Sequence, residues 1–189
     1  MPELSIFQLG LAITSYDLRA GYVLGFEIAS KRQHMDQYEK TLIVPNTLHP
    51  VKEDGFVMSW MLHANAHGRI MLMVVRKTSD ADAEGTCSVQ VVASMTYNAE
   101  KSGEHQVDCS EKPLAARAGD LLCFMCVDRP MIPFDIEAGQ DEYPLYQLLD
   151  DEPHTEQTIA VETWQQEGSR HYSLNAFIVP GRPGILIQL

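Results

Sequence analysis

The residues best suited to carry chemistry lie in one acidic stretch of the chain. Four carboxylates stand within eight residues around Gly139: Asp135, Glu137, Asp141 and Glu142. Hard cations such as calcium take about six to eight oxygen ligands, and a loop between strands can supply several of them. The spacing is not that of an EF-hand loop. We therefore predict a divalent cation such as calcium at these four residues, with solvated loop acids that aid solubility as the alternative.

Aromatic residues accompany these acids. Flat rings stack against sugars and apolar ligands, and neighbouring carboxylates accept protons from hydroxyl groups. The sequence therefore predicts a face that binds a carbohydrate, a small molecule or a protein partner, made by Tyr143, Tyr146, Trp164, Asp135 and Asp141. The alternative is that these rings fill the core, as we expect for Phe134 and Tyr172.

Two cysteines, Cys123 and Cys126, have the spacing of a redox or metal site. The residues around them are strand-like, and in an extended strand residues three apart point to opposite faces. Their sulfur atoms would then diverge, whereas a disulfide needs Cβ atoms about 3.8 Å apart. We predict buried free thiols that are not bridged to one another.

No motif in the chain identifies an enzyme, and catalytic residues stay unassigned. A Gly-x-Ser-x-Gly elbow, a phosphate loop and a dinucleotide fingerprint are all missing. His63 and His67 stand four apart, which would suit a metal on a helix, but the glutamate of a zinc-hydrolase helix does not follow His63. We expect these two histidines to flank a turn and face water.

The negative charge of the chain is concentrated in the acidic region. Residues 128–167 hold eleven acidic residues and one basic residue, a net charge of −10 out of −12 for the whole chain. A surface that binds a polyanion is hard to build on such a chain, so we expect no nucleic-acid partner. A cation or a cationic partner would relieve the repulsion among these carboxylates.

Length and composition are those of one globular domain over residues 1–189. The 189 residues are 45% hydrophobic, without an internal repeat or a linker-like run. The N-terminus lacks the pattern of a signal peptide, and no apolar run approaches the roughly 20 residues that span a bilayer. We predict a cytoplasmic protein with no membrane span; leaderless export is the alternative.

The fold prediction begins at residues 114–127, where a Gly-Asp turn leads into seven residues with almost no polar content. Such a run is typical of a strand in the middle of a core. Short apolar segments separated by turns predict an all-β, antiparallel β-sandwich or jelly-roll-like fold, with a partly closed barrel as the alternative. A capping box from Ser30 to Gln33 predicts one short helix near residues 31–40.

Two further segments are predicted as hairpins. Residues 55–67 fit either a strand or a helix, and we favour a strand that turns through 64–68 and pairs with 69–77, because the flanking runs match in length. Residues around Gly168 predict a second hairpin.

We predict a non-catalytic binding protein, functioning as a homo-oligomer, because nine methionines and unpaired strand edges suit an interface. The alternatives are a small β-barrel or jelly-roll enzyme with a site assembled from distant residues, and a structural assembly subunit.

Overall fold

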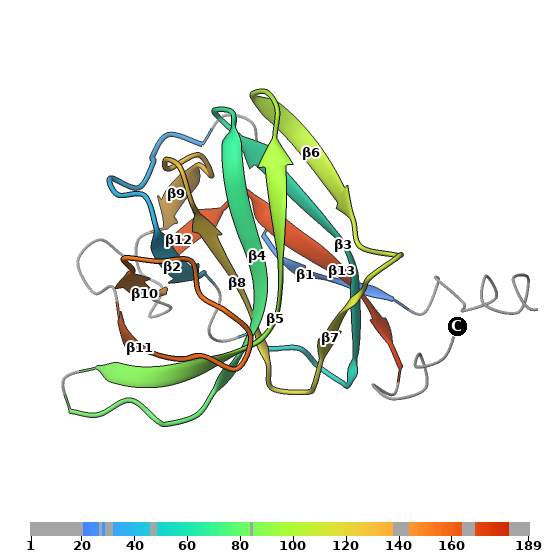
Figure 1. Ribbon diagram of the computed structural model, residues 1–189, viewed down its shortest axis with the longest axis vertical. Helices are drawn as coiled ribbons and strands as arrows, with labels where there is room; N and C mark the ends of the chain where they lie inside the picture. The colour runs from blue at the N-terminus through green and yellow to red at the C-terminus, as the bar shows by residue number, and fades with distance from the viewer. Residues whose placement is uncertain are drawn as a thin grey trace, which may run out of the picture.

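The computed structural model describes residues 21–26, 28, 32–45, 49–83, 85–137, 144–163 and 169–181. Thirteen strands and no helix lie in these residues, and all their ladders are antiparallel. Figure 1 shows a closed barrel with an open sheet packed behind it. The prediction of an all-β, antiparallel fold is confirmed.

Six strands close into the barrel. Their order around it is β10 (Leu145–Leu148), β11 (Thr158–Thr163), β5 (Thr86–Ala99), β4 (Gly68–Lys77), β8 (Leu121–Cys126) and β2 (Thr41–Val44). The strand β4 lies between β5 and β8, so that Leu72 is opposite Met95 on one side and Phe124 on the other. The segment that the sequence marks as a central strand is therefore β8.

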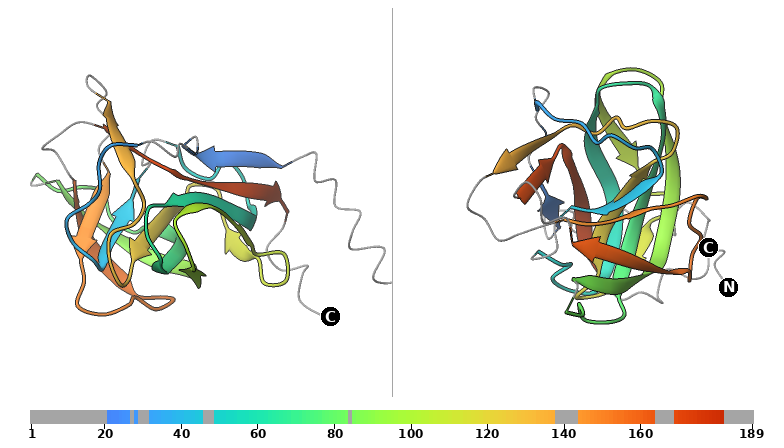
Figure 2. Two further views of the ribbon diagram at one scale, coloured as in Figure 1. Left: turned by 90° about the horizontal axis from the view of Figure 1, so that it is seen from above. Right: turned by 90° about the vertical axis from the view of Figure 1, so that its left-hand side faces the viewer.

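The remaining strands form two smaller sheets. What we call the outer sheet has the order β1 (Tyr22–Gly25), β13 (Leu174–Pro180), β3 (Gly55–Ala64) and β6 (Gly103–Asp108), with β7 (Leu114–Ala116) also paired to β3. The third sheet pairs β9 (Phe134–Glu137) with β12 (Ser169–Tyr172). Figure 2 shows β1, in blue, alongside β13, in red, on the far side of the molecule from β5.

The strands β4 and β8 separate two hydrophobic cores. Side chains such as Leu72 and Phe124 point toward the outer sheet, whereas their neighbours Met73 and Cys123 point into the barrel, and all four are fully buried. A strand covered on both faces has no solvent side on which to place polar residues, which explains the unbroken apolar run of β8. Each large aliphatic side chain buried there stabilises the fold by about 1.5–3 kcal/mol.

The alternation along β8 also decides the state of its cysteines. Cys123 packs inside the barrel and Cys126 packs in the core beneath the outer sheet, so their side chains leave opposite faces of the strand. Both thiols are free and buried, as are those of Cys87 and Cys109. The prediction that Cys123 and Cys126 are not bridged is confirmed.

The prediction of a helix near residues 31–40 is wrong. Residues 32–40 are irregular, and His34 makes an isolated bridge to Phe134 through two backbone hydrogen bonds of 3.0 Å. The Lys40 N–H donates to the carbonyl of Cys126 at 2.8 Å. Tertiary partners thus take backbone groups that a helix would pair internally, and such contacts override a weak local propensity.

Both predicted hairpins are wrong in their pairing, although their strands exist. Residues 55–64 and 68–77 form β3 and β4 with a turn between them, but β3 pairs within the outer sheet and β4 within the barrel. The strands on either side of Gly168 likewise do not pair with each other, because β11 lies in the barrel and β12 pairs with β9. Alternating side chains identify a strand but do not identify its partner.

Candidate ligand-binding pocket

Most of the predicted acidic–aromatic site lies outside the described residues, namely Asp141, Glu142, Tyr143 and Trp164. Of the others, Tyr146 is half-buried on β10 and donates a hydrogen bond to Glu162 Oε2 at 3.2 Å. Partial burial, followed by that carboxylate, raises the pKa of Tyr146. The backbone of Glu137 lies in β9, opposite Ser169. The predicted face therefore stays a prediction.

Asp135 is the one predicted metal ligand whose side-chain partners are described. Its carboxylate accepts hydrogen bonds from Arg32 Nη1 at 3.2 Å and from the backbone N–H of Gln33 at 3.1 Å. Within the described parts of the chain, no group of three or more His, Cys, Asp or Glu residues is placed to hold a metal ion. Calcium binding at Asp135, Glu137, Asp141 and Glu142 stays a prediction, since two of the four fall outside those parts.

Other acids of the same region pair with an arginine of the barrel. Arg69 donates to Asp128 at 2.9 Å and to Glu152 at 2.8 Å, and all three side chains are partly exposed. The Arg69 hydrogen bonds lower the pKa of Asp128, and the two carboxylates raise the pKa of Arg69. Part of the negative charge that marks this region in the sequence is therefore neutralised within the fold.

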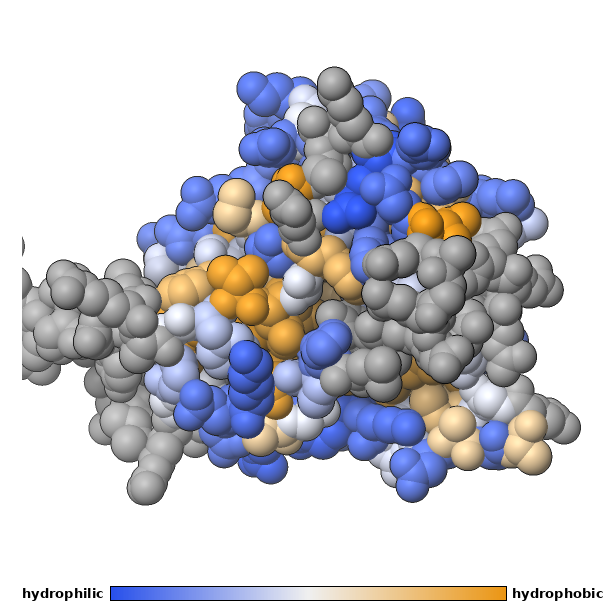
Figure 3. Space-filling model, turned by 180° about the vertical axis from the view of Figure 1, so that it is seen from behind, coloured by the Kyte–Doolittle hydropathy of each residue, from blue (hydrophilic) through white to orange (hydrophobic). Residues whose placement is uncertain are grey.

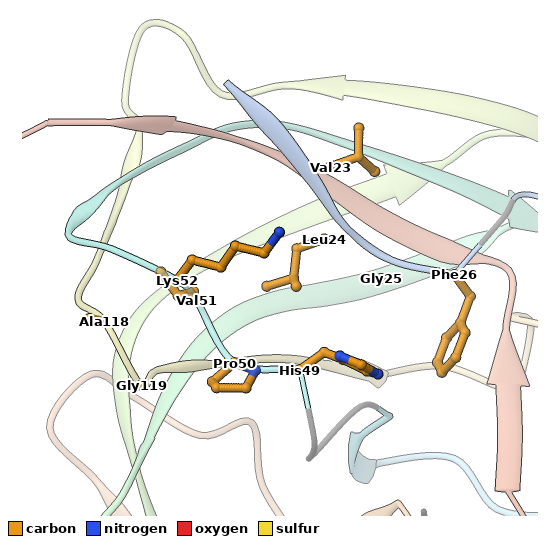
Figure 4. A pocket seen from close by; sticks show the side chains of 10 residues that line it. All are labelled: Val23, Leu24, Gly25, Phe26, His49, Pro50, Val51, Lys52, Ala118 and Gly119. Carbon is orange, nitrogen blue, oxygen red and sulfur yellow. The ribbon is translucent and has the colours of Figure 1, made fainter. Parts of the chain in front are cut away.

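A pocket lies elsewhere, between the edge strand β1 and two loops. It is a cavity of about 730 Å³, lined by Val23, Leu24, Gly25, Phe26, His49, Pro50, Val51, Lys52, Ala118 and Gly119. In Figure 4 the Lys52 side chain extends from its loop toward β1, and the His49 ring points toward Phe26. Segments far apart in the sequence thus meet along one side of the outer sheet.

Hydrogen bonds fix the loop wall of this pocket. The Val51 N–H donates to the Asp120 carbonyl at 2.8 Å, and the Gly119 N–H returns a bond to the Val51 carbonyl at 2.9 Å. The Asp120 side chain is 1% exposed and takes two hydrogen bonds from Arg76, at 2.7 and 2.9 Å. Gly119 has a φ of +92°, a conformation that favours glycine, so the Gly-Asp turn suits this position.

The opposite wall is tied to the same loop and to the small sheet. The backbone N–H of Lys52 donates to the Tyr22 hydroxyl at 2.9 Å, and Lys52 Nζ lies 5.2 Å from the centre of the Tyr22 ring. The Phe26 ring stacks on His171 with 4.4 Å between ring centres, and the Phe26 N–H donates to the carbonyl of Leu174. Both ends of β1 are therefore held in place by contacts within the protein.

The chemistry of the lining is apolar with two nitrogen-bearing side chains. Leu24 and Val51 are buried and continue into the core beneath the outer sheet, whereas His49 and Lys52 are exposed. None of the ten lining residues is an acid, a serine or a cysteine. The arrangement can hold an apolar molecule and contact a polar or anionic group on it.

Sequence reasoning missed this pocket and used its Gly119-Asp120 turn only to locate a strand. The one available signal was that turn, because an aspartate beside a buried strand needs a partner. Nothing in the spacing of residues 22–26 and 49–52 indicates that these segments meet. Their proximity depends on β1 pairing with β13 at the far end of the chain.

A second cluster of charged side chains is closed to solvent. Arg170 Nη1 donates to Asp36 Oδ1 at 2.7 Å, with the two side chains 4% and 7% exposed, and the Tyr172 hydroxyl donates to the same oxygen at 3.1 Å. Burial, and then the Asp36 charge, raises the pKa of Tyr172 well above its usual value. We name Asp36, Arg170 and Tyr172 the buried triad; it joins the irregular segment 32–40 to β12.

The buried cysteines offer no nucleophile. Burial raises the pKa of Cys109 to about 11 and that of Cys126 to about 12, and it raises the pKa of Cys123 as well. A thiol reacts as its thiolate, so these groups are inert at neutral pH.

No protein-family model, curated protein or solved structure matches this chain. The parts of the chain that the structure describes contain no helix long and apolar enough to cross a membrane. Support for a function therefore comes from the geometry and chemistry of the pocket.

Proposed function

We propose that the protein binds a small molecule in the pocket between β1 and residues 49–52, without catalysing a reaction. The observation that carries this proposal is a cavity of about 730 Å³ whose walls are held by hydrogen bonds on both sides. Sites for small molecules are concave, largely preformed and mostly apolar, with a few polar groups that orient the ligand. The floor made by Leu24 and Val51, with His49 and Lys52 above it, has this composition.

Binding is favoured over catalysis by the identity of the lining side chains. Covalent catalysis needs a nucleophilic side chain such as a serine, threonine or cysteine, with a base beside it. The ten lining residues include one histidine, His49, and no carboxylate or hydroxyl side chain. These groups suit recognition of a ligand better than a change to its bonds.

The expected homo-oligomer is a separate proposal, and the outer sheet supports it. Val23 on β1 and Met61 on β3 are 62% and 41% exposed, and both lie on the face turned away from the barrel. Figure 3 shows apolar side chains gathered in the middle of this rear face. Sedimentation of wild type and of Met61→Lys tests this idea, because a charge on the interface would dissociate the assembly.

The proposed pocket is tested by filling its mouth. Ala118 is exposed at the edge of the cavity, and a tryptophan there would occupy part of it. We expect octan-1-ol, a neutral apolar probe, to bind the wild type in a calorimetric titration and to bind Ala118→Trp at least about tenfold more weakly. Ala81→Trp, on an exposed loop between β4 and β5, is the matched control and should bind as the wild type does.

Equal binding of octan-1-ol by the wild type and by Ala118→Trp would place any ligand site elsewhere and reject the proposal. The same conclusion follows if the wild type binds neither octan-1-ol nor octanoate, an anion with the same alkyl chain. A circular dichroism spectrum and a melting temperature of each variant show whether the fold is intact.

A further inference from the structure

We infer that the ligand of this pocket is a monoanion, a carboxylate attached to an apolar body, and that Lys52 binds its charge. This inference rests on the proposed function, because it names the chemical class of molecule that the same pocket accepts. It begins from the position of Lys52, the one lysine or arginine among the lining residues.

Lys52 lacks the acidic partner that half of the other lysines and arginines in the described residues have. Ion pairs are formed in the described residues by Arg32, Arg69, Arg76, Lys77 and Arg170, with nitrogen–oxygen distances between 2.7 and 3.6 Å. Lys52 forms none there; its ammonium group lies 5.2 Å from the centre of the Tyr22 ring. A cation over an aromatic face stays available to an anion, because the ring contributes no charge of its own.

The acids nearest to Lys52 in the sequence either form a hydrogen bond with another residue or lie exposed to solvent. The Asp54 side chain accepts the backbone N–H of Ala118 at 3.0 Å, and Glu53 is exposed. In a chain with a net charge of −12, the hydrogen bond from the Lys52 backbone N–H to the Tyr22 hydroxyl holds this lysine at the rim of the apolar cavity. A ligand carboxylate would complete the pairing that the protein leaves open.

The surroundings of Lys52 favour one negative charge over several. A lysine binds phosphate as a point charge, and phosphate sites commonly add the fork of an arginine or a nest of free backbone N–H groups. On the loop wall, the N–H groups of Ala118 and Gly119 are already bonded, to Asp54 and to the Val51 carbonyl. The overall negative charge of the chain also disfavours a polyanion more than a monoanion.

The remaining lining explains why the anion needs an apolar body. Leu24 and Val51 form a buried floor, and Pro50 and Phe26 supply further apolar surface beside it. A small hydrophilic anion would leave this surface in contact with water, whereas an alkyl or aromatic group would cover it. The two features together select an amphipathic carboxylate.

The test compares octanoate with octan-1-ol, which share an alkyl chain and differ in charge. In calorimetric titrations we expect the wild type to bind octanoate more tightly than octan-1-ol. Lys52→Met keeps most of the lysine stem and removes the charge, so octanoate affinity should fall about tenfold while octan-1-ol affinity changes less than about twofold. Lys112→Met, on the exposed turn between β6 and β7, is the control and should leave both affinities unchanged.

The outcomes separate this inference from the proposed function. Octan-1-ol binding that Ala118→Trp weakens, together with octanoate binding that Lys52→Met leaves unchanged, would keep the pocket and overturn the carboxylate inference. A wild type that prefers octan-1-ol over octanoate would overturn it equally. A wild type that binds neither octan-1-ol nor octanoate would reject the pocket itself. Lys52 is exposed, so we expect Lys52→Met to melt at the same temperature as the wild type. An unchanged melting temperature would show that any loss of affinity does not come from unfolding.

Discussion

Within the described residues, a cation lies over an aromatic ring in two places, and the two differ in what surrounds the charge. Lys52 lies 5.2 Å from the centre of the Tyr22 ring at the edge of an open pocket; it is exposed and forms no ion pair with any acid that the structure describes. Arg170 lies 4.4 Å from the Phe134 ring, is 4% exposed, and pairs with Asp36 at 2.7 Å. The first charge is available to a ligand, whereas the second is neutralised by the chain itself.

The difference follows from the cost of removing a charge from water. A buried ion must be paired and hydrogen-bonded, so Asp36 takes bonds from both Arg170 and Tyr172. An exposed ammonium keeps its hydration and needs no partner. A buried, paired charge therefore contributes to holding the fold together, whereas an exposed charge beside an apolar cavity is free to contact a ligand.

The buried triad gives the largest expected effect. Asp36→Ala removes the carboxylate that pairs with the buried Arg170 charge, and we expect the free energy of unfolding to fall by about 3–5 kcal/mol. Urea denaturation measures this loss, and Glu53→Gln, which alters an exposed acid, should change stability by less than about 0.5 kcal/mol. A loss below about 1 kcal/mol for Asp36→Ala would mean that water reaches Arg170 and that the triad is not closed.

The Asp120–Arg76 pair is intermediate between the exposed Lys52 and the buried Asp36–Arg170 pair, because Asp120 is buried but its partner Arg76 is 33% exposed. Asp120→Ala removes the carboxylate that accepts hydrogen bonds from Arg76 and from the Arg117 N–H, and we expect a loss of about 1–3 kcal/mol in unfolding free energy. The variant should also bind octan-1-ol more weakly, because the turn whose backbone groups bond to Val51 loses the side chain that holds it. Unchanged probe binding in a destabilised but folded Asp120→Ala would show that the wall does not depend on this turn.

The pairing of Asp128 with Arg69 should appear as a pH dependence. Its folded pKa is lowered, so the pair stabilises the fold above the unfolded pKa and loses this effect as pH falls through the folded value. Both side chains are more than a third exposed, so we expect Asp128→Asn to lose only about 0.2–1 kcal/mol at pH 7. The loss should shrink near pH 3; an equal loss at both values would exclude the ion pair as its cause.

The strands of this fold could be predicted from the sequence, because burial on one or both faces leaves a local pattern. The apolar run 121–127 and the opposite faces of Cys123 and Cys126 are examples that the structure confirms. The pairing of strands could not be predicted. β3 and β4 follow one another in the chain but belong to different sheets, and only contacts far apart in sequence decide this.

The pocket could not be predicted for the same reason. The sequence instead placed the candidate site in the acidic stretch. Carboxylates close in sequence suggest a cation site, yet Asp128 and Glu152 meet Arg69 from a different strand. A single lysine at position 52 gives no local signal, because its importance depends on what β1 places opposite it.

Calcium at the acidic stretch gives the smallest expected effect. Asp135 is 48% exposed and already receives hydrogen bonds from Arg32 and Gln33, so a cation that binds Asp135 must compete with Arg32 for the carboxylate. A cation that binds only the folded protein raises its melting temperature. We therefore expect millimolar calcium to raise the wild-type melting temperature by only about 1–2 °C, and to raise that of Asp135→Asn by less.

Asp151→Asn, at an exposed acid between β10 and β11, should keep the full wild-type rise. Differential scanning calorimetry with and without calcium measures all three proteins. No rise in the wild type would reject the calcium prediction, and a full rise in Asp135→Asn would remove Asp135 from the ligand set.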